Sequence, residues 1–422
     1  MKKYSLLIIL SFLISIASAQ KLVKSYHYSD GYGIIPKSPL ERGKDIVIPF
    51  SITKNQDKKA GVLYLNKDNS IKNAILFEGK DNYVINEIIE SKNGNLLVSA
   101  EGYSEEGQES LYFIELNKST IVNDFIFNEN GNELDPFAIL ELGDNVLIGG
   151  FIKSRELVSS SFYNMYSEKQ MIYVAEFTKN GQKKWSKGFD LIGYEKGICN
   201  QMIRKDNNIF LLCHANKIGE KMAPVLIKID LQGNIIKIVE IGKLNTIVIG
   251  SKIANVDNHI KLVGCYSNDE SYLINYMFDK NLKLIESSEY KMPGRFLINY
   301  FDNNIILGSV FKDNSYNNLV VYLTNNSCNI NQFGSEKTEM LIGKSGENFF
   351  GYKIGNYKNI ISSIMIFKNF LPDLSINKKK GSLLINDQVK YTLKSKFIKS
   401  SINKGVSKVK VRNVSDKFLD LK

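Results

Sequence analysis

The sequence predicts an all-β protein: a seven-bladed β-propeller of four-stranded blades with a short basic C-terminal extension. A turn followed by a short apolar run recurs seven times along the 422 residues, at spacings of 44 to 63 residues. Each unit holds four short runs rich in Ile, Val, Phe and Tyr, and no helical 3.6-residue periodicity persists in the body. The first apolar residues after the seven turns are Ile46, Leu96, Val146, Ile209, Ile260, Ile305 and Phe349. Such units bury both faces only when they stack as a ring.

The second unit illustrates how each element is recognised. Its runs, in order, are YVINEIIES from Tyr83, NGNLLVSA from Asn93, SLYFIELN from Ser110 and NDFIFNE from Asn123. Their β-branched and aromatic side chains fit a pleated, half-buried surface. The Asn-Gly turn accepts the positive φ of a tight hairpin, as do the Asp-Asn turns of later units. We therefore expect four antiparallel strands in each unit.

Closure of the ring is predicted from the two ends of the body. The final unit has a weak fourth strand, because LPDLSINKKK follows its third run, SSIMIFKNF. The segment Lys21–Tyr28 (KLVKSYHY) has strand character and no hairpin partner before it. We expect it to supply the outer strand of the last blade. The alternatives are that LPDLSI or a strand of the tail does so.

The N-terminus reads as a secretory signal peptide. Lys2 and Lys3 precede an apolar run from Leu6 to Ile16, and Ala17-Ser18-Ala19 offers small residues for cleavage before Gln20. The run is too short to span a bilayer, and no later segment is long and apolar enough. We predict a signal peptide at 1–19, a propeller at 20–377 and an extension at 378–422. The protein is expected to be exported, to the periplasm, the cell surface or the medium.

The positive charge is concentrated in the tail. The net charge is +11, yet residues 378–422 carry 12 Lys and Arg412 against three Asp, so the body is close to neutral. This tail could be an appended hairpin, an edge-docking segment or a disordered arm. A basic tail favours an acidic partner, an acidic glycan or an envelope surface, the alternative being a solvated end. Nucleic acid is not expected as a partner of an exported chain, and we expect a monomer in isolation.

Two units carry a resemblance to known repeats. VAEFTKNGQKKWSKGF…DNNIFLLC and VLIKIDLQGNIIKIVEI…DNHIKLVG resemble the repeats of bacterial secreted β-propeller proteins, which are similar to PQQ-like and NHL-like propeller repeats. The resemblance covers about residues 40–370 and implies the fold rather than a function. The sequence departs from that pattern by having Trp in one unit only.

The titratable residues predict no catalytic, metal or cofactor site. The three histidines, His27, His214 and His259, fall in separate units without metal-binding spacing. Only five arginines occur, no Asp-box turns are present, and no carboxylate pair can be recognised at inner positions. A catalytic triad elbow and a phosphate-binding loop are also missing.

The cysteines allow one specific pairing. Cys199 and Cys213 flank the turn at 206–208 near cross-strand register, so they are candidates for a disulfide in an oxidising compartment. The alternative is that both pack as small apolar residues between blades. Cys265 and Cys328 lie in different units and are left unpaired.

A long loop marks one candidate ligand-binding face. The third unit is longer by about 13 residues, and the excess, Ser154–Gln170, lies between its second and third strands. We expect an exposed patch there, on the face that propellers commonly use for ligands. Its candidate residues are Arg155, Phe162, Tyr163 and Tyr166, with Met165 beside them. The alternative is that these side chains fold back onto the ring.

The single tryptophan, Trp185, is predicted to be a fold marker rather than a sugar platform. The repeat places it on the outer strand of the third unit, equivalent to Ile75 and Ile126, where it would pack between blades. The expected function is therefore that of an exported, non-catalytic binding or scaffold module for a protein or surface glycan. The alternatives are a lyase or glycosidase acting on polysaccharide, and a structural subunit of an envelope assembly. Converging carboxylates at the central face would favour an enzyme.

Overall fold

A computed structural model describes the chain from residue 21 to residue 420. The gaps in this description are 30–32, 55–56, 79–81, 104–108, 130–132, 160–163, 218–221, 243–245, 268–269, 303, 313–314, 325–326, 334–338, 346, 354–362, 369–373, 378, 381–383, 395–399 and 405–409. The predicted signal peptide lies outside the described residues. No helix in the described residues has the length and apolar character needed to cross a membrane.

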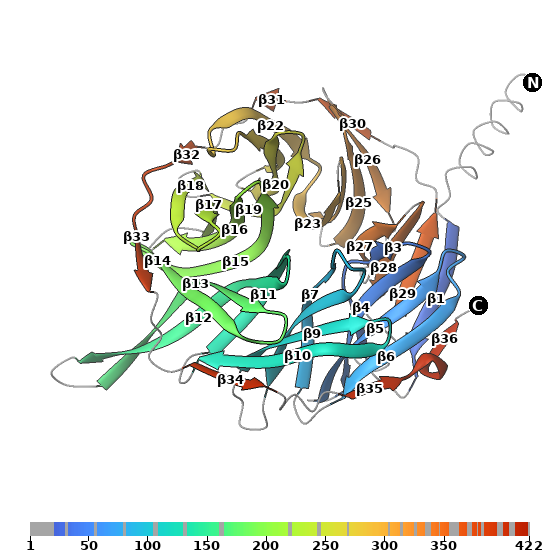
Figure 1. Cartoon of the computed structure of the whole chain (residues 1–422). Coiled ribbons are helices and arrows are strands. Elements are labelled where there is room, and N and C mark those ends of the chain that lie inside the picture. Colours follow the sequence, from blue (N-terminus) through green and yellow to red (C-terminus); the bar gives the residue numbers. More distant parts are fainter. Residues whose placement is uncertain are drawn as a thin grey trace, which may run out of the picture.

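The described residues are almost entirely β-strand and form six sheets arranged around a common centre as a β-propeller (Figure 1). The first two sheets contain β2 (Gly33–Pro36), β3 (Leu40–Arg42), β4 (Asp45–Lys54), β5 (Asp57–Asn66) and β6 (Ile71–Glu78), and then β7 (Asn82–Glu90), β8 (Leu96–Tyr103), β9 (Glu109–Asn117) and β10 (Thr120–Glu129). A ten-stranded sheet contains β11 (Glu133–Leu142), β12 (Asn145–Ser159), β13 (Asn164–Thr178) and β14 (Lys183–Leu191), followed by β15 (Tyr194–Lys205), β16 (Asn208–Lys217), β17 (Met222–Asp230) and β18 (Ile235–Gly242).

The remaining sheets complete the ring. Two of them contain β19 (Ile247–Val256), β20 (His259–Ser267), β21 (Ser271–Phe278) and β22 (Leu284–Met292), and then β23 (Arg295–Asp302), β24 (Ile305–Lys312), β25 (Ser315–Leu323) and β26 (Ser327–Phe333). The last contains β27 (Glu339–Ser345), β28 (Asn348–Lys353), β29 (Ser363–Lys368) and β1 (Lys21–Tyr28). We call each of the following sets of strands a group: β2–β6, β7–β10, β11–β14, β15–β18, β19–β22, β23–β26, and β27–β29 with β1. Within each group, neighbouring strands pair antiparallel.

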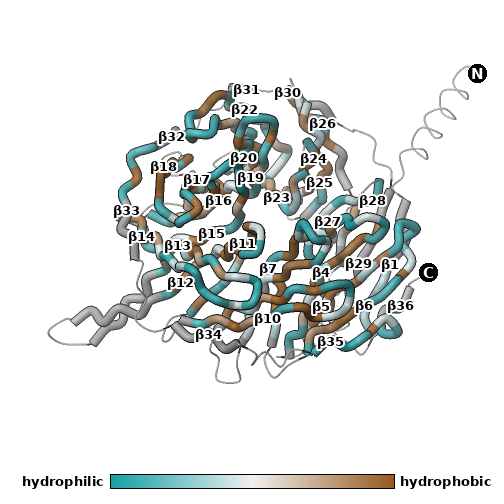
Figure 2. The backbone as a smooth tube through the Cα atoms, in the orientation of Figure 1, coloured by the Kyte–Doolittle hydropathy of each residue, from teal (hydrophilic) through white to brown (hydrophobic). Residues whose placement is uncertain are grey.

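The second strand of each group is buried on both faces. In β4 the seven residues from Ile46 to Ile52 are all buried, and β20 is buried continuously from Ile260 to Tyr266. A strand buried on one face alone would alternate instead. The hydrophobic clusters accordingly lie between neighbouring groups: one joins residues of β4–β6 to residues of β7–β9, and another joins the first group to β28, β29 and β1. Figure 2 shows the hydrophobic residues along the middle of strands such as β5 and β10.

The hairpin turns adopt the conformations that their residues favour. Gly94 in the Asn-Gly turn has φ 80°, and Asp206 and Asp257, in the turns that begin with Asp-Asn, have φ 55° and 50°. These values lie in the left-handed region, which Gly, Asn and Asp adopt most readily.

Ring closure by the N-terminal segment is confirmed. β1 pairs antiparallel with β29, with Tyr26 opposite Ile364, so a strand from the start of the chain completes the last group. The side chain of Tyr26 is buried and its hydroxyl donates to the carbonyl of Asn69, in the first group. The alternative segment LPDLSI pairs elsewhere, because β30 (Leu374–Asn377) lies against β26.

The C-terminal tail lies along the outer rim, shown in red in Figure 1. After β30, its strands are β31 (Lys379–Lys380), β32 (Leu384–Asn386), β33 (Tyr391–Lys394), β34 (Ser400–Lys404), β35 (Lys410–Asn413) and β36 (Phe418–Asp420), with a 3-10 turn at Ser415–Lys417. They pair antiparallel with β22, β18, β14, β10, β6 and β1, in that order. Of the three alternatives for the tail, its described strands form the edge-docking segment.

The extra residues of the third unit differ from the loop expected of them. They lengthen β12 and β13 to 15 residues each, and the ladder continues to the pair Ser159–Asn164. The hairpin thus runs past the start of the inner strand β11, where Glu133 pairs with Lys153. The backbone N–H and C=O groups of this segment bond across the β12–β13 ladder, so its described residues form paired strands where a long surface loop was expected.

Candidate functional site

The inner strands share a recurring irregularity near the centre of the ring. The pairing of an inner strand with its second strand shifts register by one residue in β7, β11, β15, β19, β23 and β27 (Figure 1). The extra residues at the position that the six strands share are Asn86, Phe137, Asn200, Ser251, Asn299 and Ile342, and β15 has a further one at Glu195. A β-bulge bends its strand and redirects a side chain, so these positions aim residues away from the regular ladder.

Side chains at and beside the bulges bond to the next inner strand. Asn86 donates to the carbonyl of Pro136, and Asn299 donates to the carbonyl of Leu341 at 3.1 Å. The amide of Ile253 donates to the side chain of Gln201 at 2.7 Å. These bonds connect successive groups close to the axis.

Three carboxyl groups, Glu87, Glu101 and Asp135, interact electrostatically with one another or with Lys37 and Lys252 at this centre. Glu87 accepts a hydrogen bond from the amide of Ile139 at 2.7 Å. Burial raises the pKa of Glu87 to about 7, although the charge of Lys252 and this amide oppose the rise. Because Lys252 lies on β19 and Glu87 on β7, strands from distant parts of the chain converge here.

Asp135 and Glu101 share a hydrogen bond between β11 and β8. Burial raises the pKa of Asp135, with this bond and the charge of Lys153 opposing the rise. The pKa of Lys37, between β2 and β3, is lowered by burial, while the charge of Glu101 opposes that change. A hydrogen bond between two carboxyl groups requires a proton on one of them.

The half-buried histidine near this centre is uncharged at neutral pH. His214 on β16 lies 2.7 Å through Nδ1 from the side-chain oxygen of Asn200. Burial lowers the pKa of His214 to about 4, and a hydrogen bond with the backbone of Gly250 opposes that shift. An uncharged imidazole joined to a bulge residue connects the second strand of one group to its inner strand.

A cleft of about 690 Å³ lies between the first and second groups. Ion pairs cross its walls: Arg42 contacts Glu90 at 3.3 Å and Lys72 contacts Asp45 at 2.8 Å. The hydroxyl of Tyr64 donates to the carbonyl of Lys118 at 2.6 Å. The lining residues are Arg42, Gly43, Asp45, Tyr64, Lys72, Asn73, Glu90, Gly94, Lys118, Ser119 and Asn413.

The residues expected on the ligand-binding face are only partly described. Arg155 pairs with Glu168 and Tyr166 with Leu157 along the backbone of the β12–β13 hairpin. Phe162 and Tyr163 lie outside the described residues. The structure thus places Arg155 and Tyr166 in one ladder, the β12–β13 hairpin, and on other strands than Glu87, Glu101 and Asp135.

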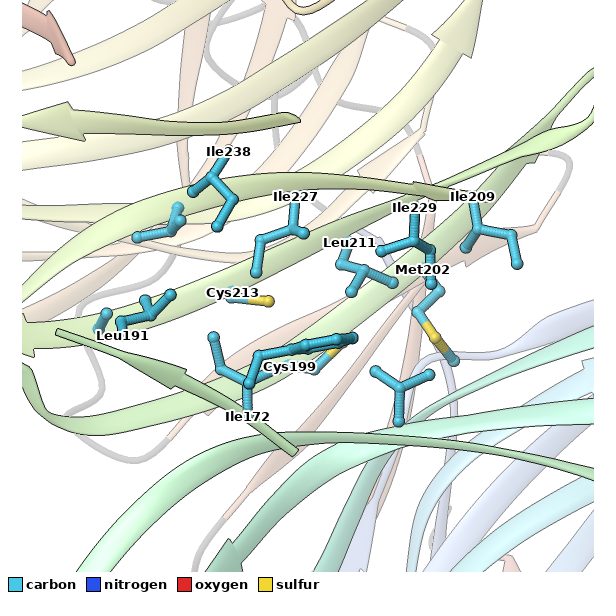
Figure 3. Packing of buried hydrophobic residues seen from close by; sticks show 14 of the residues in the cluster. Ile172, Leu191, Cys199, Met202, Ile209, Leu211, Cys213, Ile227, Ile229 and Ile238 are labelled. Atoms are coloured by element: carbon cyan, nitrogen blue, oxygen red, sulfur yellow. The ribbon is translucent and has the colours of Figure 1, made fainter. Parts of the chain in front are cut away.

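The expected register of Cys199 and Cys213 is confirmed. The two residues are direct partners in the β15–β16 ladder, and both are fully buried. They are free thiols, and Cys199 donates to the carbonyl of Gln201 at 3.8 Å, within a cluster that includes Ile172, Leu211 and Ile227 (Figure 3).

Sequence reasoning missed the axial carboxyl groups, although it had a signal for their position. Asn86, Asn200 and Asn299 occupy corresponding places in VINEII, GICNQM and FLINYF. A polar amide inside an apolar run predicts a residue turned toward a partner. Glu101 and Asp135 carried no such signal, because only the closed ring brings different groups together at the axis.

Comparison with known proteins identifies no family. No family model matches the chain, and no curated protein matches it. Among solved structures, a mutant levansucrase of B. megaterium is 10% identical, covering 71% of this chain and 87% of that chain, with a TM-score of 0.32.

Proposed function

We propose that this chain is an exported, non-catalytic propeller of seven four-stranded blades that acts as a binding or scaffold module. Its partner is a protein or a surface glycan at the cell envelope or outside the cell. Seven blades are supported by the ten-stranded sheet, whose two groups are joined by the single parallel pair Gln170–Lys196. Export is supported by the character of residues 1–19. The quoted repeats support kinship with secreted PQQ-like or NHL-like propellers.

The observation that carries the binding role is the long β12–β13 hairpin. Its strands pair through Ser159–Asn164 and extend beyond the beginning of β11 (Figure 1). The hairpin adds length at the end of the third group where inner strands begin, the face commonly used for ligands. A paired two-stranded projection can present side chains at a lower ordering cost than a loop.

The experiment removes the hairpin tip and measures capture of partners. Residues 155–168 are replaced by an Asn-Gly turn, and the mature protein is immobilised against solubilised native envelope material. We expect the intact chain to retain a discrete partner. The shortened variant should bind that partner about tenfold more weakly or worse, which corresponds to a loss of about 1.4 kcal/mol in binding free energy. A matched control replaces 105–107, between β8 and β9, with Gly-Ser-Gly. Equal retention by all three proteins would reject the hairpin as the binding element.

An enzyme acting on polysaccharide is the second candidate, favoured by the converging carboxyl groups Glu87, Glu101 and Asp135. It ranks below binding because Glu101 and Asp135 bond to one another. Glycoside hydrolysis by two carboxyl groups needs a separation of about 5 to 9.5 Å. Glu87 is likewise occupied by the amide of Ile139.

Activity assays separate the two candidates. The mature protein is incubated with a panel of neutral and acidic polysaccharides, and new reducing ends and unsaturated products are measured. The binding proposal predicts no product above that of a Glu101→Gln/Asp135→Asn double variant. Product formation that this variant abolishes, while its circular dichroism is unchanged, would establish the enzyme instead.

A further inference from the structure

The tail visits every strand group once, in reverse chain order. Its first strand pairs with β26, and the next five pair with β22, β18, β14, β10 and β6 before β36 reaches β1. In each case the partner is the outermost strand that the body of the chain provides. The tail is therefore one continuous strap around the circumference, assembled from strands of two to five residues.

The strap covers the edges that a ring of sheets leaves open. An outermost strand presents unpaired N–H and C=O groups, which pair readily with any extended segment. Tail strands occupy these groups, as where β34 pairs with β10 from Phe125–Lys404 to Glu129–Ser400. Each of these contacts is short, so the strap depends on the sum of many contacts.

Apolar side chains within and between the tail strands anchor the strap. Ile376, Val389 and Val411 pack against the clusters of three different group interfaces, and Val414 is itself buried in the cluster that closes the ring. The amide of Val414 also donates to the carbonyl of Ala74 at 2.8 Å. The tail is thus docked by side chains as well as by ladders.

Charge separates the strap from the body. Residues 378–422 carry 13 basic and three acidic side chains, while the rest of the mature chain is close to neutral. Arg412 in β35 contacts Glu78 in β6 at 2.9 Å, so part of this charge is paired with the body. Lys-rich edge strands resist pairing with further strands, and net charge opposes self-association.

We propose that the rim is a strand-accepting surface, occupied in cis by the tail and, when the tail is displaced, by second copies of this chain. A second copy suits it because the exposed edges are mutually compatible antiparallel ladders. Displacing the tail uncovers edge strands of a body that is itself nearly neutral, so these edges add little like-charge repulsion of their own. The tail strands act as intramolecular donor strands, and their lysines leave the completed rim unattractive to further strands.

The test keeps the full mature chain and weakens the strap in place. A triple variant, Ile385→Pro, Leu393→Pro and Ile402→Pro, removes one tail N–H from each of β32, β33 and β34 and disfavours their pairing. Its matched control carries three prolines at 382, 395 and 407, between tail strands. Light scattering after size exclusion measures mass over a concentration series, and hydrogen exchange measures protection of β10, β14 and β18.

The proposal expects a monomer for the native chain and the control, and dimers or larger species that increase with concentration for the triple variant. A synthetic peptide spanning 374–420 returns the variant to monomer mass. A monomeric variant with faster exchange in β10, β14 and β18 overturns the proposal, because the edges are then open yet take no second copy. A monomeric variant with unchanged exchange overturns it too, since the strap would then not be what covers these edges.

Discussion

At the scale of single residues, Trp185 makes a hydrogen bond to a glutamate that an asparagine makes in the preceding group. The indole N–H of Trp185 donates to Glu176 at 2.6 Å, and Asn145 donates to the other oxygen at 2.5 Å. In the preceding group Asn123 and Asn95 bind Glu115 in the same way, at 2.6 and 2.8 Å. Register therefore makes Trp185 equivalent to Asn123, correcting its assignment to Ile126.

The expected packing of Trp185 between strand groups is confirmed. Its ring packs against the cluster shared by β11–β14 and β15–β18. Gly233, with φ 75°, lies so close that a Cβ there would be 2.7 Å from the ring. A glycine is thus required at this turn both by the backbone conformation and by the indole.

Replacement Trp185→Phe tests this bond. The variant leaves one oxygen of the Glu176 carboxylate without its donor, and we expect a loss of about 1 to 3 kcal/mol in the free energy of unfolding. Denaturant unfolding followed by far-ultraviolet circular dichroism measures it, since the variant lacks the only tryptophan. Asn123→Ala, which removes the equivalent donor from Glu115, is the matched comparison. An unchanged midpoint would mean that the indole N–H contributes nothing.

Oxidation of Cys199 and Cys213 is the second prediction. Directly opposed residues of an antiparallel ladder have Cα atoms about 4.5 to 5.5 Å apart, within disulfide range. Exported protein is expected to lose two hydrogens to a disulfide oxidant and to gain about 3 kcal/mol from closing a short loop. Intact mass after alkylation, with and without reductant, measures this. Four alkylated thiols without reductant would show that the pair instead stays reduced as packed side chains.

Glu87 predicts a pH dependence of stability. Its pKa rises from 4.5 to about 7 on folding. Between these values the folded state binds more protons than the unfolded state, so this carboxyl makes stability fall as pH rises from 4.5 through 7. Glu87→Gln removes that contribution. The free energy of unfolding of the variant minus that of the native chain is therefore expected to be more positive at pH 8 than at pH 5. Denaturant midpoints at both pH values measure it, and parallel profiles would contradict it.

At the scale of elements, closure depends on β1 and inter-group contact on the bulges. The strand at Lys21–Tyr28 was predictable because it has strand character and no hairpin partner before it, while the final unit has a weak fourth strand. The bulges were not predicted, because a polar residue within an apolar run can equally be a side chain that faces solvent. In place of the loop expected at 154–170, Ser154–Ser159 pair in register with Asn164–Lys169.

Tyr26→Ala tests the closing strand. Tyr26 packs in the cluster that joins the first and last groups, and its removal is expected to cost about 3 to 5 kcal/mol. Thermal unfolding and susceptibility to protease measure the loss. Tyr103→Ala, at the end of β8, provides a comparison within a continuous group. If both variants unfold together with the native chain, β1 is not needed to hold the ring closed.

At the scale of the whole molecule, the path of the tail determines where the excess positive charge lies. The sequence shows that the excess positive charge lies after residue 377, and it allows a hairpin, a docked segment or a disordered arm. In the structure the described tail strands distribute that charge around the circumference (Figure 1). A basic rim, unlike a basic end, meets an anionic surface from any side of the ring.

By itself, the sequence determined the all-β class, the repeated strand groups, the closing strand, the positive-φ turns and the register of Cys199 with Cys213. These features depend on local chemistry and on short-range period, which a single chain displays. Only the tertiary structure decided the course of the tail and the meeting of Glu87, Glu101 and Asp135 with Lys37 and Lys252. Those features join residues far apart in the chain, because ring closure alone brings separate groups to one axis and one rim.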